Sequence, residues 1–178
     1  VTYMGIGSAE IRIDVRQIKD IDSMTAQIAA ALGTDRQVKE YTVLQTCSYP
    51  AALPDGGTIN LTVETGDHSI FPVSFSAGTL PMGENEIALS SLNAEELKLS
   101  VGDTLDLNVN GKKSGYTVCG IYSDITNGGK TAKIRNRPDT APVIWSVLYA
   151  SLEESTDKEQ WMAKYRGTGV DVTDVEDY

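Results

Sequence analysis

Apolar and polar residues alternate at the front of the chain, and the period of the alternation changes along it. Residues 9–15 place an apolar side chain at every second position, as a β-strand with one buried face does. Residues 20–33 place them at every fourth position, which is the spacing of one helical face. Asp22 is a suitable N-cap for this helix and Gly33 a suitable residue to end it. With a further β-like stretch over residues 38–47, the pattern predicts a strand–helix–strand unit.

The middle of the chain consists of short alternating stretches separated by turn residues. Residues 48–57 are rich in proline and glycine, Pro50 among them, and predict a loop. Asn93 is expected to cap a brief helix over residues 94–98. Asn110-Gly111 is a strong signal for a tight hairpin turn. Strands are predicted over residues 58–65, 70–75, 86–89, 104–109 and 116–122.

The last third of the chain returns to a strand–helix–strand pattern after a polar stretch. Residues 124–140 predict a long loop, and its basic side chains could dock an acidic partner or simply be solvated. Residues 143–149 form a nearly continuous apolar run, as in a central strand with two buried faces. Ser155 or Thr156 is expected to cap a helix, and Thr156 with Glu159 fits a capping box. Residues 170–172 predict a last strand. The basic residues are Lys130, Lys133, Arg135 and Arg137.

These patterns predict an α+β fold in two parts. The β-α-β units from the two chain ends, residues 1–76 and 141–178, are expected to share one sheet with two helices on a face. Together they would form a discontinuous α/β subdomain. Residues 77–140 would be an inserted, smaller and mostly β subdomain with a polar loop.

Composition and charge exclude several classes of function. The chain has 178 residues, of which 40% are hydrophobic, so a sizeable core can form. Its net charge of −10 argues against a nucleic-acid partner, because phosphate contacts need a basic face. No run approaches the roughly 20 apolar residues of a membrane helix, and we expect a piece excised from its membrane segments.

Reactive side chains are few, and we expect no catalytic residue, no cofactor-binding residue and no metal ligand. Cys47 and Cys119 have neither a CxxC nor a zinc spacing, and whether they pair is left open. His68 is the single histidine, and a Cys/His hydrolase would need it to contact a thiol. A solvent-exposed turn histidine is the alternative interpretation.

Three short motifs follow one another in residues 78–122. They read G-x-L-P-x-x-x-N-E-I-A-L-S, L-x-V-G-D-T-L and Y-x-V-x-G-I-Y. In this order the motifs resemble the periplasmic-core region of FtsX/MacB-like ABC transporter permeases. The residues that carry the resemblance are Gly78, Leu80, Pro81, Asn85, Glu86, Ile87, Ala88, Leu89, Val101, Gly102, Asp103, Val118 and Gly120. Their chemistry fits bends, turns and core positions, so we expect folding roles and no binding pocket.

The resemblance implies a non-enzymatic extracytoplasmic domain of a bacterial permease, on the outer face of the cell membrane. Its α/β part would be porter-like. Its partners would be its own transmembrane helices, a cytoplasmic ABC ATPase that supplies the energy, and an extracytoplasmic protein or peptide substrate. The full transporter would be a homodimer, and the domain would relay conformational change.

Two other functions stay open at this stage. A free-standing cell-surface binding or adhesion module predicts an exposed apolar patch or a metal cage, with chain ends at opposite poles. A small hydrolase predicts a deep pocket with perturbed carboxylates or thiols. A permease domain predicts that the two chain ends lie close together.

Overall fold

The computed structural model describes residues 9–16, 20–123, 130–138, 143–167 and 169–175. Its elements in chain order are β1 (Ile11–Arg16), α1 (Ile21–Thr34), β2 (Val38–Ala52), β3 (Thr58–Thr65), β4 (Phe75–Gly78), β5 (Glu86–Ser90), α2 (Ser91–Leu97), β6 (Thr104–Val109), β7 (Lys112–Tyr122), β8 (Ala132–Ile134), β9 (Trp145–Leu152), α3 (Lys158–Tyr165) and β10 (Val170–Asp174). The fold is therefore mixed α and β, as the sequence predicts.

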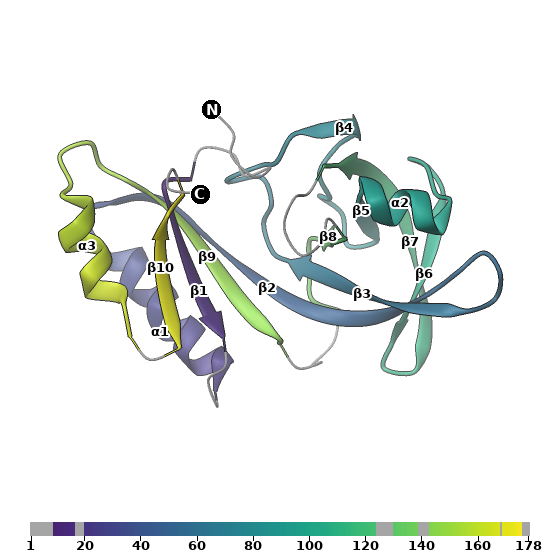
Figure 1. Cartoon of the computed structure of the whole chain (residues 1–178), viewed down its shortest axis with the longest axis horizontal. Helices are drawn as coiled ribbons and strands as arrows, with labels where there is room; N and C mark the ends of the chain where they lie inside the picture. The colour runs from purple at the N-terminus through teal and green to yellow at the C-terminus, as the bar shows by residue number, and fades with distance from the viewer. Residues whose placement is uncertain (1–8, 17–19, 124–129, 139–142, 168, 176–178) are drawn as a thin grey trace.

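The strands form one hydrogen-bonded path in the order β10-β1-β9-β2-β3-β8-β5-β7-β4. Strand β6 lies off this path and pairs with β7, and at one position with β2. Neighbours are antiparallel except β3 with β8 and β5 with β7. In Figure 1, β2 runs from the half that carries α1 and α3 into the half that carries α2.

Strands from both ends of the chain alternate in one layer at the α1/α3 end. Strand β1 pairs with β9 on one side and β10 on the other, and β9 pairs with β2. The alternation seen in the sequence sends one set of side chains toward α1 and α3 (Figure 1). This core contains Ile11, Ile13, Val15, Ile28, Leu32, Leu148, Ala150, Leu152, Trp161, Met162, Val170 and Val172.

A second core lies at the other end, between β2, β3 and the middle segment of the chain. Its members include Tyr49, Leu61, Ile87, Leu107 and Val118, all 2% exposed or less. Residues of β2 and β3 thus pack with residues 87–134, across the boundary expected near residue 76. The subdomain limits 1–76, 77–140 and 141–178 remain a prediction.

Strand β2 is longer than the sequence predicts, because residues 48–52 continue the strand where we expected a loop. Pro50 is tolerated inside it for a geometric reason. The Leu53 amide donates to the Gly57 carbonyl at 2.8 Å. In an antiparallel pair every second pair of opposite residues exchanges backbone hydrogen bonds, so this bond shows which pairs of β2 and β3 do so. By that alternation, Pro50 opposite Asn60 faces its nitrogen away from β3, so no bond to β3 is lost.

The first helix is capped two residues earlier than predicted. The Asp20 carboxylate, and not that of Asp22, accepts the Ser23 amide at 3.1 Å. Gly33 lies inside α1, and Asp35 is the C-cap.

The other two helices also differ from the prediction at their starts. The Ser90 hydroxyl accepts the Asn93 amide at 3.4 Å, so Ser90 caps α2 in place of Asn93. The Asp157 carboxylate accepts the Gln160 amide at 3.2 Å and caps α3 in place of Thr156. Each observed cap precedes its helix by one residue, where a side-chain oxygen reaches an unpaired amide three positions on.

Two irregular segments were assigned wrongly from the sequence. The strand expected over residues 70–75 begins only at Phe75, and the preceding segment instead buries Phe71 against the sheet. The long loop expected over residues 124–140 contains β8, three residues that join β3 to β5. Residues 124–129 and 139–142 lie outside the described residues. A three-residue strand is too short to show a period, so its pairing is visible only in three dimensions.

Candidate functional site

The first and last described segments of the chain lie side by side. The Val175 amide donates to the Glu10 carbonyl at 2.8 Å, and β10 pairs with β1 from Asp174 back to Val170. Figure 1 shows β1 and β10 as neighbouring strands at the same end of the sheet. Any segments that flank these residues therefore start from neighbouring points.

A cluster of ionisable side chains is enclosed between β3, β8 and the segment that follows β3. Glu64 on β3 and Lys133 on β8 are opposite each other in the parallel register, and the Lys133 Nζ lies 2.7 Å from the Glu64 Oε1. Their side chains are only 18% and 12% exposed. His68 places its Nδ1 4.0 Å from the same Glu64 oxygen, and its Nε2 lies 2.9 Å from the Ile134 carbonyl. We call Glu64, Lys133 and His68 the junction cluster.

The surroundings of the junction cluster set its charge. Burial, and then the positive charge of Lys133, lower the pKa of His68 from 6.5 to about 4. Burial acts to raise the pKa of Glu64, but the nearby Lys133 and His68 outweigh it and lower that pKa. At neutral pH the cluster thus holds one ion pair and a neutral imidazole.

A second buried pair lies on β1, on the sheet face opposite to α1 and α3. Arg12 donates from Nε and Nη2 to the Asp14 carboxylate at 3.0–3.1 Å, and its Nη1 donates to the Tyr149 hydroxyl at 3.2 Å. The Arg12 charge also helps to lower the pKa of Glu64. Charged residues of β1, β3 and β8 therefore act on one another across the sheet.

The basic residues of the segment predicted as a loop pair with carboxylates of the same chain. Lys130 lies 2.7 Å from Glu96, and Lys133 pairs with Glu64. Arg135 and Arg137 lie 3.9 Å from carboxylates of Asp67 and Asp22. Each of these four basic side chains thus has a carboxylate of the same chain within 4 Å, and the alternative in which the segment docks an acidic partner stays a prediction.

The cysteines and the histidine do not form a nucleophilic site. Cys47 in β2 and Cys119 in β7 are not joined by a disulfide, and both are buried. Burial, with a contribution from Glu86, raises the pKa of the Cys119 thiol to about 11, which disfavours the thiolate. The ring nitrogens of His68 lie close to the Ile134 carbonyl and the Glu64 carboxylate, and not to a thiol. His68 is 5% exposed, so the expectation of a solvent-exposed histidine is also wrong.

Two glycines of the motif set allow β4 to approach β7. Gly78 has a φ of +67°, and a Cβ there would lie 2.1 Å from the Cys119 carbonyl oxygen. A Cβ at Gly120, its partner in the register, would lie 2.2 Å from the Thr79 carbonyl oxygen. Real Cβ atoms do not approach so closely, so both positions require glycine.

Strand β5, which follows Gly78 in the sequence, is anchored by its first residue, Glu86. The Glu86 carboxylate accepts the amides of Met82 and Gly83 at 3.0 and 2.8 Å, and these bonds lower its pKa. Ahead of it, Leu80 is half-buried and Pro81 is buried, while the Asn85 carbonyl accepts the Thr117 amide at 2.8 Å. The fully buried motif residues are Ile87, Ala88, Leu89 and Val118.

The second motif forms the turn between α2 and β6. The Asp103 carboxylate accepts the Ser100 amide at 2.8 Å, and Gly102 has a φ of +98°. The Gly102 amide donates to the Val118 carbonyl at 2.8 Å, which ties the turn to β7. Val101 is 44% exposed. These contacts are folding contacts, and the common role of the motif set remains a prediction.

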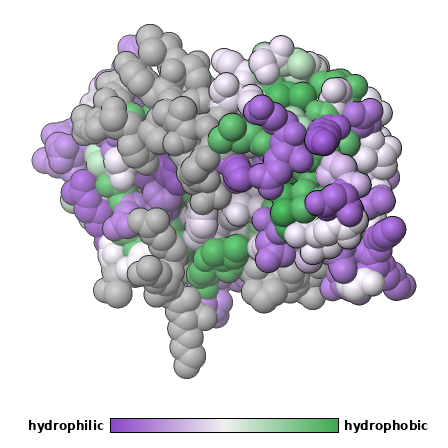
Figure 2. All heavy atoms as spheres, turned by 45° about the vertical axis from the view of Figure 1, so that its right-hand side comes forward, coloured by the Kyte–Doolittle hydropathy of each residue, from purple (hydrophilic) through white to green (hydrophobic). Residues whose placement is uncertain are grey.

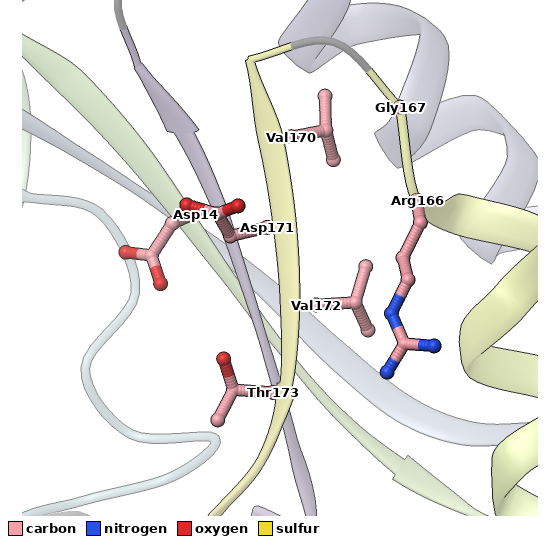
Figure 3. Close-up of a pocket in the computed structure, with 7 residues that line it drawn as sticks. All are labelled: Asp14, Arg166, Gly167, Val170, Asp171, Val172 and Thr173. Carbon is pink, nitrogen blue, oxygen red and sulfur yellow. The ribbon is translucent and has the colours of Figure 1, made fainter.

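Two surface hollows are lined by described residues. The larger, an open depression of about 730 Å³, lies along β10 and the α3–β10 connection. In Figure 3 the side chains of Asp14, Asp171 and Thr173 lie on one side of β10, and Arg166 with two valines lies on the other. The smaller hollow, of about 290 Å³, lies between β3 and α2. Neither gathers a nucleophile with a base.

Exposed large apolar side chains are dispersed over several segments. Met82, Leu92, Val101 and Ile144 are 44–63% exposed and lie in a loop, a helix, a turn and the approach to β9. Figure 2 shows apolar side chains alternating with polar ones over the β-rich end. Within the described parts of the chain, no cluster of three potential metal ligands occurs. No helix there is long and apolar enough to cross a membrane.

Comparison with known proteins identifies the fold. No family model matches the sequence, and no curated protein matches it. The periplasmic region of MacB from Actinobacillus actinomycetemcomitans superposes with a TM-score of 0.65 at 12% identity, over 97% of this chain and 92% of that one. The extracellular domain of the noncanonical ABC-type transporter YknZ from Gram-positive bacteria gives 0.59 at 12% identity, over 92% and 99%.

A third solved structure agrees with these two. A domain assigned to a permease protein from Porphyromonas gingivalis gives a TM-score of 0.54 at 12% identity, over 95% of this chain and 87% of that one. The resemblance drawn from the motifs is therefore confirmed at the level of the fold.

Proposed function

We propose that this chain, which has the fold of MacB-type permease ectodomains, is the extracytoplasmic domain of an ABC transporter permease. The observation that carries the proposal is the hydrogen-bonded contact between the described ends, Glu10 with Val175, in a fold of this kind. Two membrane helices of one permease lie close together in the bilayer. A domain inserted between them must therefore start and finish at neighbouring points.

The proposed role is to relay conformational change and not to catalyse a reaction. A cytoplasmic ABC ATPase would move the membrane helices, and those helices would move β1 and β10. The neighbouring strands would carry the motion to the β-rich end, where an extracytoplasmic protein or peptide would bind. Strand β2 supports this path, since it contributes to both cores.

Three further features belong to the same proposal. The α/β part would comprise residues 1–76 and 141–178, and the inserted part residues 77–140. The motif residues from Gly78 to Gly120 would keep the inserted part folded, and the full transporter would be a homodimer. The free-standing adhesion module is the weaker alternative, because it predicts chain ends at opposite poles.

The location can be tested with a single exposed cysteine. Asp55 lies in the exposed turn between β2 and β3, and both native thiols are buried. In the full-length protein, Asp55→Cys should react with a membrane-impermeant maleimide in intact cells whose outer envelope is permeable to it. Labelling that occurs only after the cells are lysed would contradict the proposal. The unsubstituted protein is the control.

The relay can be tested by replacing the domain. Because the described ends are adjacent, a Gly-Ser linker of about six residues can join the two flanking segments without separating them. The permease with this replacement should still assemble with its ATPase in nanodiscs, while its ATP hydrolysis and transport become uncoupled. Unchanged coupled transport after the replacement would refute the relay.

A further inference from the structure

The segment between β3 and β4 connects two packed regions of the molecule without forming a helix or a strand. It comprises residues 66–74, which we call the strap. Ile70 and Phe71 pack with buried residues of β2 and β9, and Phe71 is only 7% exposed. Val73 packs with buried residues of β5 and β7 instead. In Figure 1 the strap leaves the arrowhead end of β3 and leads to β4.

One carbonyl of β8 holds the start of the strap. The Ile134 carbonyl accepts the Gly66 amide at 3.3 Å. The same carbonyl lies 2.9 Å from the His68 Nε2, which must carry a hydrogen because a carbonyl can only accept. The Thr42 hydroxyl of β2 donates to the Asp67 carbonyl at 3.1 Å. The first three residues of the strap are thus bonded to β8 and β2.

This arrangement leaves the other ring nitrogen of His68 able to take up a proton. With its hydrogen on Nε2, the neutral ring has a lone pair on Nδ1. That nitrogen lies 4.0 Å from the Glu64 Oε1, and the Lys133 Nζ is already 2.7 Å from the same oxygen. The His68 side chain is only 4% exposed. A proton on Nδ1 would therefore enclose a second cation beside one carboxylate.

The other charges around His68 are already paired. Each carboxylate of this region has a cation within 4 Å, so a proton at His68 adds an uncompensated positive charge. Tyr122 and Tyr149, which contact Lys133 and Arg12, add phenol hydroxyls and no carboxylate. The three ion pairs are Lys133 of β8 with Glu64 of β3, Arg12 with Asp14 on β1, and Arg135 with Asp67 of the strap.

We propose that acid releases the strap: when His68 takes up a proton, residues 66–74 leave the sheet while the rest of the fold stays closed. The charged ring can reach water only if the strap lifts, because β3 and β8 belong to the sheet. The strap is not part of a strand ladder, so lifting it breaks fewer bonds than unfolding the sheet. Release would uncover the apolar surface under Phe71 and loosen the connection between β3 and β4.

Proton binding sets the size of the expected effect. Burial, and then the charge of Lys133, hold the pKa of His68 at about 4 in the closed strap, against 6.5 for a ring in water. The equilibrium between closed and open strap should therefore shift about 30-fold toward the open form from pH 8 to pH 5. The proposal does not depend on the transporter assignment, so the two can fail separately.

Amide hydrogen exchange of the purified domain measures this opening at Gly66, whose bond to the Ile134 carbonyl breaks when the strap lifts. After correction for the intrinsic exchange rate at each pH, the opening constant of Gly66 should rise about 30-fold from pH 8 to pH 5. It should depend only weakly on urea, because a local opening exposes little surface. The Leu148 amide, in a strand paired on both sides, reports global unfolding as the internal reference.

His68→Gln is the matched variant, since an amide can still donate to the Ile134 carbonyl but does not titrate. Its opening constant at Gly66 should change less than about threefold over the same pH range. Equal pH dependence in both proteins would overturn the proposal. In the unsubstituted domain, equal opening constants for Gly66 and Leu148 at pH 5 would also overturn it, because the strap would then open only with the whole fold.

A fluorine label gives a second readout that needs no substitution in the strap. The chain has two phenylalanines, so fluorophenylalanine labels Phe71 in the strap and Phe75 in β4. At pH 5, saturation transfer in fluorine NMR should connect the Phe71 signal with that of an open form. Phe75, which packs against Tyr122, should show no such exchange. Equal exchange at both rings, or none at Phe71, would overturn the proposal.

Discussion

At the scale of single residues, the junction cluster shows how a charge is kept inside a sheet. A buried charge without a partner costs several kcal/mol, so an enclosed carboxylate needs an opposite charge close to it. Lys133 meets this need for Glu64 at 2.7 Å, and Lys133 also lies 5.0 Å from the ring of Tyr122. The pair depends on two strands that are distant in sequence.

Removing one member of this pair should destabilise the fold. Lys133→Met leaves the Glu64 carboxylate enclosed without its cation, and we expect a loss of roughly 2–4 kcal/mol in the free energy of unfolding in urea. The double variant Glu64→Leu, Lys133→Met should recover most of the loss, because no charge is then enclosed. A loss in the double variant equal to the sum of both single losses would show that the pair does not interact.

His68 should make stability depend on pH in a defined window. The unfolded chain binds a proton at His68 below pH 6.5, but the folded chain accepts it only near pH 4. The free energy of unfolding therefore keeps its full value with respect to His68 above pH 6.5. As the pH falls toward 4, protonation of the unfolded chain lowers it by about 3 kcal/mol in total.

His68→Gln removes this titration while an amide can still donate to the Ile134 carbonyl. The free energy of unfolding in urea of the unsubstituted protein, minus that of the variant, should fall by about 3 kcal/mol from pH 7 to pH 4. Carboxylates that lie far from His68 titrate in both proteins and cancel in the difference. A difference that does not change with pH would exclude the buried neutral histidine.

At the scale of elements, close backbone approach decides how β4 joins the sheet. Gly78 opposes Gly120 across the β4–β7 pair, and neither position leaves room for a Cβ. Gly111, in the β6–β7 turn, has a similar positive φ of +77° but no atom within 4 Å of a Cβ. A comparison of Gly78 with Gly111 therefore separates the cost of a positive φ from the cost of a steric clash.

Gly78→Ala should therefore cost more than Gly111→Ala. We expect about 1–2 kcal/mol for Gly111→Ala from the left-handed backbone alone. For Gly78→Ala we expect roughly 2–4 kcal/mol, because β4 must also move away from the Cys119 carbonyl. Urea unfolding of both variants makes the comparison. Equal losses would mean that β4 can shift freely.

Helix α3 is fixed to the end of α1 by one carboxylate. Asp35 accepts the Trp161 indole N–H at 2.9 Å and the Tyr165 hydroxyl at 2.8 Å through the same oxygen. Burial acts to raise the Asp35 pKa, but bonds from the Gln37 amide and from these two side chains outweigh it and lower that pKa. The carboxylate is thus held in its charged form.

Asp35→Ala should release α3 from this contact. We expect a loss of about 2–3 kcal/mol, together with a change in the fluorescence of the buried Trp161, since bonds to a charged acceptor are lost. Asp157→Ala is the control, because it removes only the N-cap of the same helix and should cost about 1 kcal/mol. A larger loss of stability for Asp157→Ala than for Asp35→Ala would show that the N-cap, and not Asp35, holds α3 in place.

At the scale of the whole molecule, the layer of β10, β1, β9 and β2 brings the two described ends of the chain together. The front of the chain supplies β1 and β2, and the back supplies β9 and β10. None of these strands has a neighbour that follows it directly in sequence within the layer. The described ends finish next to each other for this reason.

A circular permutant should test this closure. Joining Val175 to Glu10 with a short Gly-Ser linker and opening the exposed turn at Asp55–Gly56 should give a protein whose unfolding free energy lies within about 2 kcal/mol of the original. Opening the chain between Leu148 and Tyr149, inside β9, should prevent folding and serves as the control. Failure of the first permutant would show that the ends are not adjacent in solution.

The sequence by itself determined the local elements. Alternation at Ile11, Ile13 and Val15 marked a buried strand face, and Asn110-Gly111 marked the hairpin of β6 and β7. These features can be predicted locally, because the spacing of apolar residues along a strand or helix shows which side of that element is buried. The ordered motifs further indicated the fold that the comparisons then showed.

Only the tertiary structure decided the pairings between distant segments. Strand β2 continues through Pro50 because its partner strand needs no bond there, and β8 is a strand only because β3 and β5 lie on either side of it. The junction cluster likewise results from the register of β3 with β8. Register is set by contacts between residues far apart in the sequence, and the spacing of apolar residues within one strand does not identify those contacts.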